Sequence, residues 1–243
     1  MRVVFECADW LVVEKPAHLL IHPTRPDGTH TLWHELLEAY PGETLSLMNR
    51  LDRETSGLVL VSRHRQAASL FGKMTMRREI QKDYLALVEG EAPEEGAIDV
   101  PLDRLGKYRQ ESPIYLKQGV VPEGYPAQTY FKRLGVRMYS TVKKISLLEV
   151  RLGTGRLHQI RVHLAHIGHP VIGDKIYGPD EMCYLRFIET GWTSELEEIL
   201  CLSRHALHAY SLKFAWEGRD HEITIPLPED LKNFWENLQK VAS

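Results

Sequence analysis

Two apolar runs, residues 45–48 and 58–61, flank a short segment that carries four charged side chains. The segment reads "NRLDRETSGLVLVS" over residues 49–62, and its charges are Arg50, Asp52, Arg53 and Glu54. Charges between two strands usually mark a turn, so a solvated hairpin is the simplest interpretation. Any fold of this chain must therefore bring several charged groups to the start of a buried strand.

The remaining pattern favours strands over helices. Apolar or alternating runs predict strands at 8–16, 57–62, 82–90, 127–136, 143–153, 206–216 and 221–227. Amphipathic spacing predicts helices at 31–40, 66–80 and 228–242, with Leu37 and Leu70 on the inward faces of the first two. Residues 91–125 are rich in proline and glycine and predict a loop-rich excursion. Because strands do not alternate with helices, we expect an α+β fold with a mixed, largely antiparallel sheet.

Composition places the chain among soluble globular proteins. It has 243 residues, 43% of them hydrophobic and 26% charged, which allows one large domain or two subdomains. No apolar run has the length of a membrane span, and the N-terminus lacks the pattern of a signal peptide. The three cysteines form no CxxC pair, which argues against a disulfide framework or a cysteine zinc site. We expect a cytoplasmic protein that does not contact a membrane.

Basic residues gather in one region although the net charge is −3. Residues 63–82 contain six lysines and arginines and one acid, Glu79. Such a stripe can bind phosphates of RNA or DNA, or it can be the solvated face of a helix. Charge alone leaves both interpretations open.

A second unusual segment, "TGRLHQIRVHLAHIGHPVIGD", covers residues 154–174. It predicts a helix with Thr154 as its N-cap and Gly168 at its end. Arg161 falls inside the apolar stripe formed by Leu157, Ile160, Leu164 and Ala165. A buried cation needs a paired carboxylate, unless its long stem carries the charge out to water.

The same segment holds His158, His163, His166 and His169, which suggests a metal site. Their helical angles diverge, however, and no HExxH motif is present. The sequence therefore favours histidines that point outward or face phosphates, and predicts no metal.

Together these segments resemble the RluA-type family of RNA pseudouridine synthases. The resemblance covers nearly the whole chain in family order: "LVVEKPAHLLIHP" (11–23), "NRLDRETSGLVLVS" (49–62), "QKDYLALVEG" (81–90), "TGRLHQIRVHLAHIGHPVIGDKIYG" (154–178) and "RHALHAYSLKF" (204–214). It implies the pseudouridine synthase fold, a mixed sheet in two subdomains with a central catalytic cleft. It also implies that residues 1–243 form a single catalytic domain, with no separate S4-type RNA-binding domain.

The resemblance assigns chemistry to three residues. Asp52 matches the family's catalytic aspartate, which acts as a nucleophile at C1′ of uridine or as a base at the 2′ position. Arg161 matches the basic partner of that aspartate, so the two would explain each other's position. Tyr84 matches the tyrosine that stacks on the flipped uracil. No redox cofactor, metal or ATP is implied.

Other positions are expected to contact RNA. Arg50 matches the arginine that enters the space left by the flipped uridine, and Lys15, Arg156 and His158 are candidates for contact with the RNA backbone. Thr55, Ser56 and Gly57 are expected to shape the turn that presents Asp52.

Two residues depart from the family pattern. Asn49 replaces the usual histidine before "RLD", and His18 replaces the usual glycine after "KPA". Both are expected to affect the choice of RNA target rather than catalysis.

The predicted function is isomerisation of specific uridines in structured RNA, ribosomal RNA or tRNA, by a monomeric enzyme. A non-catalytic RNA-binding or ribosome-assembly protein on the same fold is the main alternative. A histidine-based metal hydrolase is a more distant one.

Overall fold

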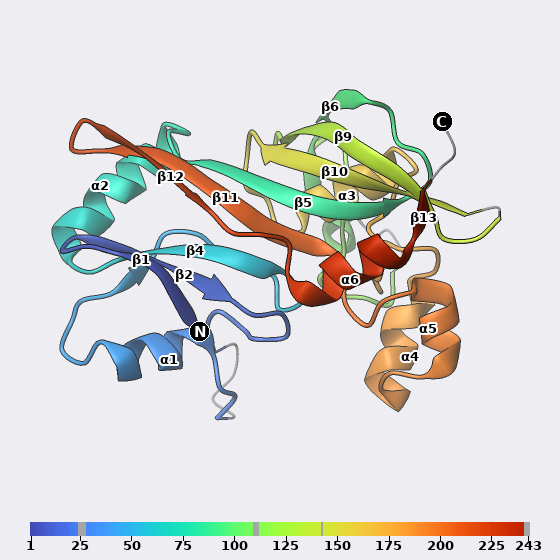
Figure 1. The fold of residues 1–243 in the computed structure, drawn as a ribbon, viewed down its shortest axis with the longest axis horizontal. Helices are drawn as coiled ribbons and strands as arrows, with labels where there is room; N and C mark the ends of the chain where they lie inside the picture. The colour runs from blue at the N-terminus through green and yellow to red at the C-terminus, as the bar shows by residue number, and fades with distance from the viewer. Residues whose placement is uncertain (24–27, 109–111, 142, 241–243) are drawn as a thin grey trace. The chain divides into compact units, whose positions relative to one another are not determined.

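The computed structural model describes residues 1–23, 28–108, 112–141 and 143–240. The chain forms two compact units, each made from two separate stretches of sequence (Figure 1). Unit 1 comprises Met1–Asp83 and His208–Leu227, and unit 2 comprises Tyr84–Leu207 and Pro228–Ser243.

Unit 1 is built on a sheet of strands that run in the order β1, β2, β4, β11, with β3 added to β4 and β12 to β11. The strands are β1 Arg2–Glu6, β2 Trp10–Lys15, β3 Ser46–Leu47, β4 Ser56–Ser62, β11 Leu207–Trp216 and β12 Arg219–Thr224. Neighbouring strands pair antiparallel, except that β4 and β11 are parallel. The sheet thus joins the N-terminal stretch to one that lies far along the chain.

Two helices complete unit 1, α1 Leu32–Ala39 and α2 Arg65–Met76. The side chains of Thr31 and His64 accept backbone N–H groups of their first turns and so cap them. The core includes Trp10, Val12, Leu58, Leu60, Phe71 and Phe214. Leu37 and Leu70, which the helical spacing placed inward, are instead 44% and 42% exposed.

Unit 2 contains a second set of strands in the order β5, β10, β9, β13, with β6 also paired to β9. Its strands are β5 Gln81–Glu89, β6 Glu95–Asp99, β7 Leu102–Arg104, β8 Gln118–Val120, β9 Gln128–Met138, β10 Lys144–Leu152 and β13 Gln239–Lys240. β7 and β8 pair antiparallel, and the 3-10 helix η1 Leu105–Tyr108 follows β7. The helices are α3 Gln159–His166, α4 Met182–Thr190, α5 Ser194–Leu200 and α6 Glu229–Asn237.

Several boundaries in unit 2 differ from the prediction. α3 begins at Gln159, because the Thr154 hydroxyl donates to the Gln159 side chain instead of capping a helix at 154. The end near Gly168 is confirmed, with a positive φ of 82° there. Residues 91–125 hold three short strands rather than loops alone, and α6 ends at Asn237. The predicted helical residues 241 and 242 lie outside the described part of the chain.

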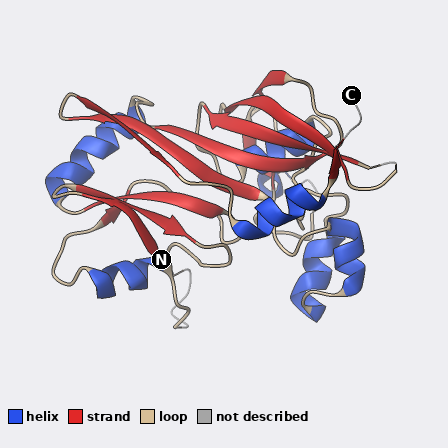
Figure 2. Ribbon diagram, in the orientation of Figure 1, coloured by secondary structure: helices blue, strands red, loops and turns tan. Residues whose placement is uncertain are grey.

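The α+β class and the mixed, mainly antiparallel strand pairing are confirmed, and each unit contains both helices and strands (Figure 2). Among the described residues, every helix is too short or too polar to cross a bilayer.

Candidate active site

Asp52 lies on a tight turn that leads directly into β4. The amide of Thr55 donates to the Asp52 carbonyl at 3.1 Å, which closes the turn, and the Asp52 side chain is half-buried. Thr55 and Ser56 are buried, at 2% and 3% exposure. The charged segment is therefore a turn, as predicted, and it holds the Asp52 carboxylate just before the start of a fully buried strand.

The start of β4 is fastened to β11 by a buried serine–histidine contact. Ser56 Oγ lies 2.9 Å from His208 Nδ1, and His208 Nε2 lies 3.0 Å from the Pro226 carbonyl oxygen. Since a carbonyl only accepts, Nε2 carries the proton, and Ser56 donates to Nδ1. Gly57 has a φ of 123°, and an added Cβ would collide with the Ala209 backbone. Only glycine allows β4 and β11 to approach so closely here.

Lys15 supports the Asp52 turn from inside unit 1. Its side chain is fully buried, and its ammonium donates to the carbonyls of Pro16, Leu19 and Arg53 at 2.8, 2.8 and 3.1 Å. These three contacts tie the Lys15 ammonium to the loop after β2 and to the Asp52 turn. The structure thus gives Lys15 a place in holding the turn, and its contact with an RNA backbone stays a prediction.

Replacing Lys15 by Met should destabilise unit 1. The substitution removes the donor from three partly buried carbonyls, and we expect a loss of about 1–3 kcal/mol in the free energy of unfolding. Urea denaturation measures it, with Lys73→Met on the exposed face of α2 as the matched control. A Lys15→Met protein of unchanged stability that binds RNA weakly would instead support the RNA-contact role.

Asn49 also has a structural place. Its amide nitrogen donates to the Leu58 carbonyl at 3.1 Å, and its Oδ1 accepts from the Leu60 amide at 2.8 Å. The side chain thus extends the hydrogen bonding of β4. This use of both amide atoms within the chain does not support a direct role for Asn49 in choosing the RNA.

Arg50 is exposed, two residues before Asp52. Desolvation lowers the pKa of His22, and the nearby charge of Arg50 lowers it further. Both residues are exposed in unit 1.

In unit 2, Arg161 does not carry its charge to water, since it is only 4% exposed. Its Nε and Nη2 donate to the two carboxylate oxygens of Asp174 at 2.6 and 2.9 Å. Asp174 is fully buried and also accepts the amides of Ile176 and Tyr177. The expectation that Arg161 needs a carboxylate is confirmed, but sequence reasoning missed this partner.

The electrostatics of this pair follow from its burial. Desolvation alone would raise the pKa of the Asp174 carboxyl, but the charge and hydrogen bonds of Arg161, with a contribution from His205, hold it well below its ordinary value. Asp174 therefore stays ionised and fixes the orientation of the Arg161 guanidinium, whose Cζ lies 5.0 Å from the Tyr177 ring.

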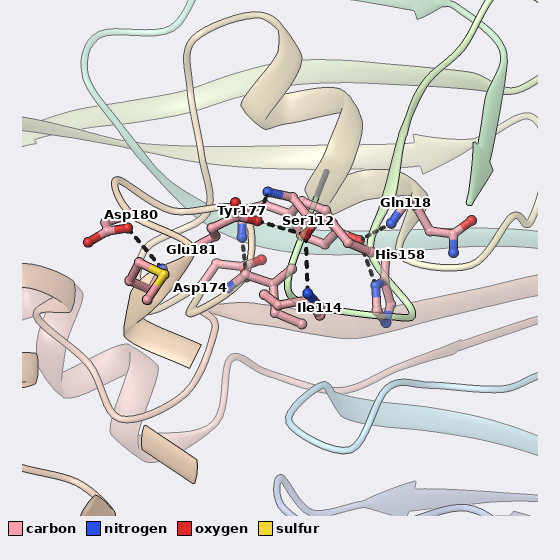
Figure 3. A network of polar contacts seen from close by, with 11 residues as sticks. Ser112, Ile114, Gln118, His158, Asp174, Tyr177, Asp180 and Glu181 are labelled. Atoms are coloured by element: carbon pink, nitrogen blue, oxygen red, sulfur yellow. Dashed lines mark hydrogen bonds and ion pairs between the residues drawn. The ribbon is translucent and has the colours of Figure 1, made fainter. Parts of the chain in front are cut away.

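Tyr177 links this pair to His158 (Figure 3). Its hydroxyl oxygen accepts a hydrogen bond from the backbone N–H of Gln118 at 2.9 Å and lies 2.8 Å from His158 Nδ1. His158 is half-buried, with a left-handed φ of 55° immediately before α3. Arg156 is exposed, donates to the Pro126 carbonyl at 3.2 Å, and has its guanidinium 5.3 Å from the Tyr125 ring. Both residues stay candidates for RNA contact.

The other histidines of this segment do not share one direction. His163 is fully buried and contacts the Thr129 hydroxyl and the Val100 carbonyl, so the expectation that it points outward is wrong. His166 is exposed, and His169 bonds the Glu89 carbonyl. Within the described ranges, no group of three potential metal ligands occurs.

Tyr84 lies in β5 and is 5% exposed. The structure thus places Arg50, Asp52 and Lys15 in unit 1, and Tyr84, Arg156, His158 and Arg161 in unit 2. The pairing of Asp52 with Arg161 stays a prediction, and so does the stacking role of Tyr84.

Comparison with known proteins shows which family has this fold and these motifs. Residues 9–166 match the family model described as RNA pseudouridylate synthase. The chain belongs to this family. Its resemblance to the RluA-type RNA pseudouridine synthases is thereby confirmed.

Two curated relatives and one solved structure show how far the similarity extends. An uncharacterized RNA pseudouridine synthase of Chloroflexus aurantiacus is 40% identical, over 94% of this chain and 66% of its own length. Ribosomal large subunit pseudouridine synthase D of Xanthomonas campestris is 34% identical, over 99% and 70% respectively. The human RNA pseudouridylate synthase domain containing 1 has 27% identity and a TM-score of 0.67, over 93% of this chain and 82% of that one. The chain thus spans roughly two thirds of each of these two curated relatives.

Proposed function

We propose that this protein isomerises specific uridines in structured RNA to pseudouridine, with Asp52 as the catalytic carboxylate. The observation that carries the proposal is the Asp52 turn itself. Lys15, the Asn49 amide and the Ser56–His208 contact hold the backbone around one half-buried carboxylate. Such positioning suits a group that must meet one atom of a substrate.

The reaction breaks the N1–C1′ bond of uridine and forms a C5–C1′ bond after the uracil has turned. N1 gains a proton and C5 loses one, so the product is an isomer and no oxidant or reductant is consumed. Asp52 acts either as the nucleophile at C1′ or as the base at the 2′ position. Arg161, held by Asp174, is the proposed basic partner, and Tyr84 the proposed stacking residue for the uracil.

Large-subunit ribosomal RNA is the favoured target class. Several relatives over 30% identical bear the name ribosomal large subunit pseudouridine synthase D, which supports ribosomal RNA over tRNA. We further propose a cytoplasmic monomer, and light scattering of the purified protein tests the oligomeric state.

A direct assay tests the activity. RNA transcribed with uridine tritiated at C5 should release tritium to water when the purified chain is added, because C5 loses its hydrogen. Large-subunit ribosomal RNA and total tRNA are the two substrates. RNA binding without tritium release from either would favour the non-catalytic alternative.

The predicted flipping role of Arg50 has its own test. Unstacking a uridine costs a few kcal/mol only where a stack exists. Arg50→Ala should therefore lower kcat/KM on structured RNA on the order of tenfold more than on a short unstructured oligonucleotide. Arg219→Ala, which removes an exposed arginine at the start of β12, is the control. Equal losses on both substrates would show that Arg50 has a different role.

A further inference from the structure

His18 has a backbone conformation that costs free energy for any residue with a Cβ. Its φ is 67°, in the left-handed region that glycine occupies without penalty. A strained conformation persists only where its surroundings impose it. Here the neighbouring backbone does so, and glycine would satisfy the same backbone at lower cost.

The loop that holds His18 is fastened to the Asp52 turn by two side chains. Arg53 Nε donates to the His18 carbonyl at 3.2 Å. Lys15 bridges the Leu19 carbonyl, on one side, and the Arg53 carbonyl, on the other. The position of the His18 backbone is therefore coupled to that of the turn.

The His18 imidazole is exposed, so packing in the core does not explain why a histidine occupies this strained position. The surface around it is rich in nitrogen donors. Arg53, whose Nε donates to the His18 carbonyl, and His22, four residues further along the same loop, are both exposed here. Arginine and histidine side chains on one surface suit RNA phosphates and the edges and faces of unstacked bases.

We propose that His18 contacts the RNA next to the target uridine, and that this contact is what the strained backbone supports. The inference rests on the proposed function and adds a substrate-binding residue to it. The ligand is an RNA phosphate or base edge, held by the imidazole beside the Asp52 turn.

The test compares His18→Gly and His18→Asn with the wild type on transcribed large-subunit ribosomal RNA. Both variants accept a left-handed φ, and both lack the imidazole. We expect KM to rise about fivefold or more, the loss of one net hydrogen bond, while kcat stays within about twofold. The melting temperature of His18→Gly should not fall by more than about 2 °C, because the strain is relieved.

Glu217→Gly is the matched control. Glu217 is also exposed in unit 1 with a left-handed φ, 50°, but it lies in the turn between β11 and β12. The Glu217→Gly variant should have the same KM as the wild type. An unchanged KM for His18→Gly, or a fall in kcat alone, would overturn the proposal, the latter by showing that the loop only positions Asp52.

Failure of the proposed function is detected separately. The dissociation constant for the same RNA is measured for Asp52→Asn and for Asp52→Asn combined with His18→Gly. If the wild type releases no tritium but His18→Gly still weakens binding, the contact stands and the catalytic assignment fails. Equal dissociation constants for the two proteins would overturn the contact.

Discussion

Asp52→Asn should abolish pseudouridine formation and leave the fold intact. Asparagine keeps the size of the side chain and most of its hydrogen bonding, but it supplies neither the nucleophile nor the base that the reaction needs. We expect kcat to fall at least about a thousandfold. The turn should persist, because the Thr55 amide donates to the backbone carbonyl of residue 52, which the substitution leaves in place.

Tritium release measures the loss, and the dissociation constant for RNA is the accompanying control. Glu54→Gln removes a carboxylate from the same turn and should retain activity. If Asp52→Asn turns over at a rate near wild type, Asp52 is not the catalytic group and the proposed mechanism has to be abandoned.

Asp174→Asn should cause the largest loss of stability. The amide can still accept the backbone N–H groups of Ile176 and Tyr177, but it leaves the Arg161 guanidinium without its buried counter-charge. Breaking a buried pair from one side costs about 3–5 kcal/mol. Urea denaturation at neutral pH should show this as a large fall in the unfolding midpoint of unit 2.

A second arginine–aspartate pair in unit 2 offers a matched control. Arg204 bonds both oxygens of Asp230 at 2.6 and 3.0 Å, nearly the same geometry, but the Asp230 side chain is 53% exposed. The Arg204 side chain is only 3% exposed, but solvent reaches the Asp230 carboxylate, so Asp230→Asn should cost less than Asp174→Asn, about 2 kcal/mol. Equal losses for the two substitutions would mean that burial of Asp174 does not govern the strength of its pair.

The pH dependence of this effect has a definite sign. The pKa of Asp174 is lower in the folded protein than in the unfolded chain, so the folded state is stabilised above the unfolded value of about 3.9. That stabilisation disappears as the pH falls through the folded pKa. The difference between wild type and Asp174→Asn should therefore be full at pH 7 and shrink below about pH 4.

The same pair changes what substitution of Arg161 would do. Judged from the sequence alone, Arg161→Met would fit the apolar stripe and would restore much of the stability lost in Asp52→Ala, without restoring activity. In the structure, methionine at this position would leave the Asp174 carboxylate buried and unpaired. A stability cycle between Asp52 and Arg161 therefore needs Arg161→Lys, which keeps a cation near Asp174.

Strands β2 and β4 of unit 1 were predictable because their burial leaves a simple pattern in the sequence, whereas the mostly exposed β1 was missed. β2 and β4 are buried on both faces, so they read as unbroken apolar runs around Val12 and Leu60. The alternation of β9 and β10 was equally clear. Such hydrophobic patterns can be read along a single strand, without knowing which other strand or helix packs against it.

The partners of charged groups were not predictable in this way. Nothing in the spacing of Arg161 and Asp174 shows that a turn between them brings the carboxylate back to the guanidinium. The burial of Lys15 likewise depends on three carbonyls, one of them distant in sequence. Helices α4 and α5 did leave signals that the prediction missed, namely Thr193, which caps α5, and Gly191, which ends α4 with a φ of 76°.

The parallel pairing of β4 with β11 has a consequence for biosynthesis. Residues 56–57 pair with residues 208–209, and unit 1 includes the chain up to Leu227. At 5–20 residues per second, a ribosome needs about 7–29 s after Asp83 to reach Leu227. During this delay the apolar edge of β4 lacks its neighbour, and a nascent chain of this protein depends on late synthesis to complete the sheet that holds Asp52.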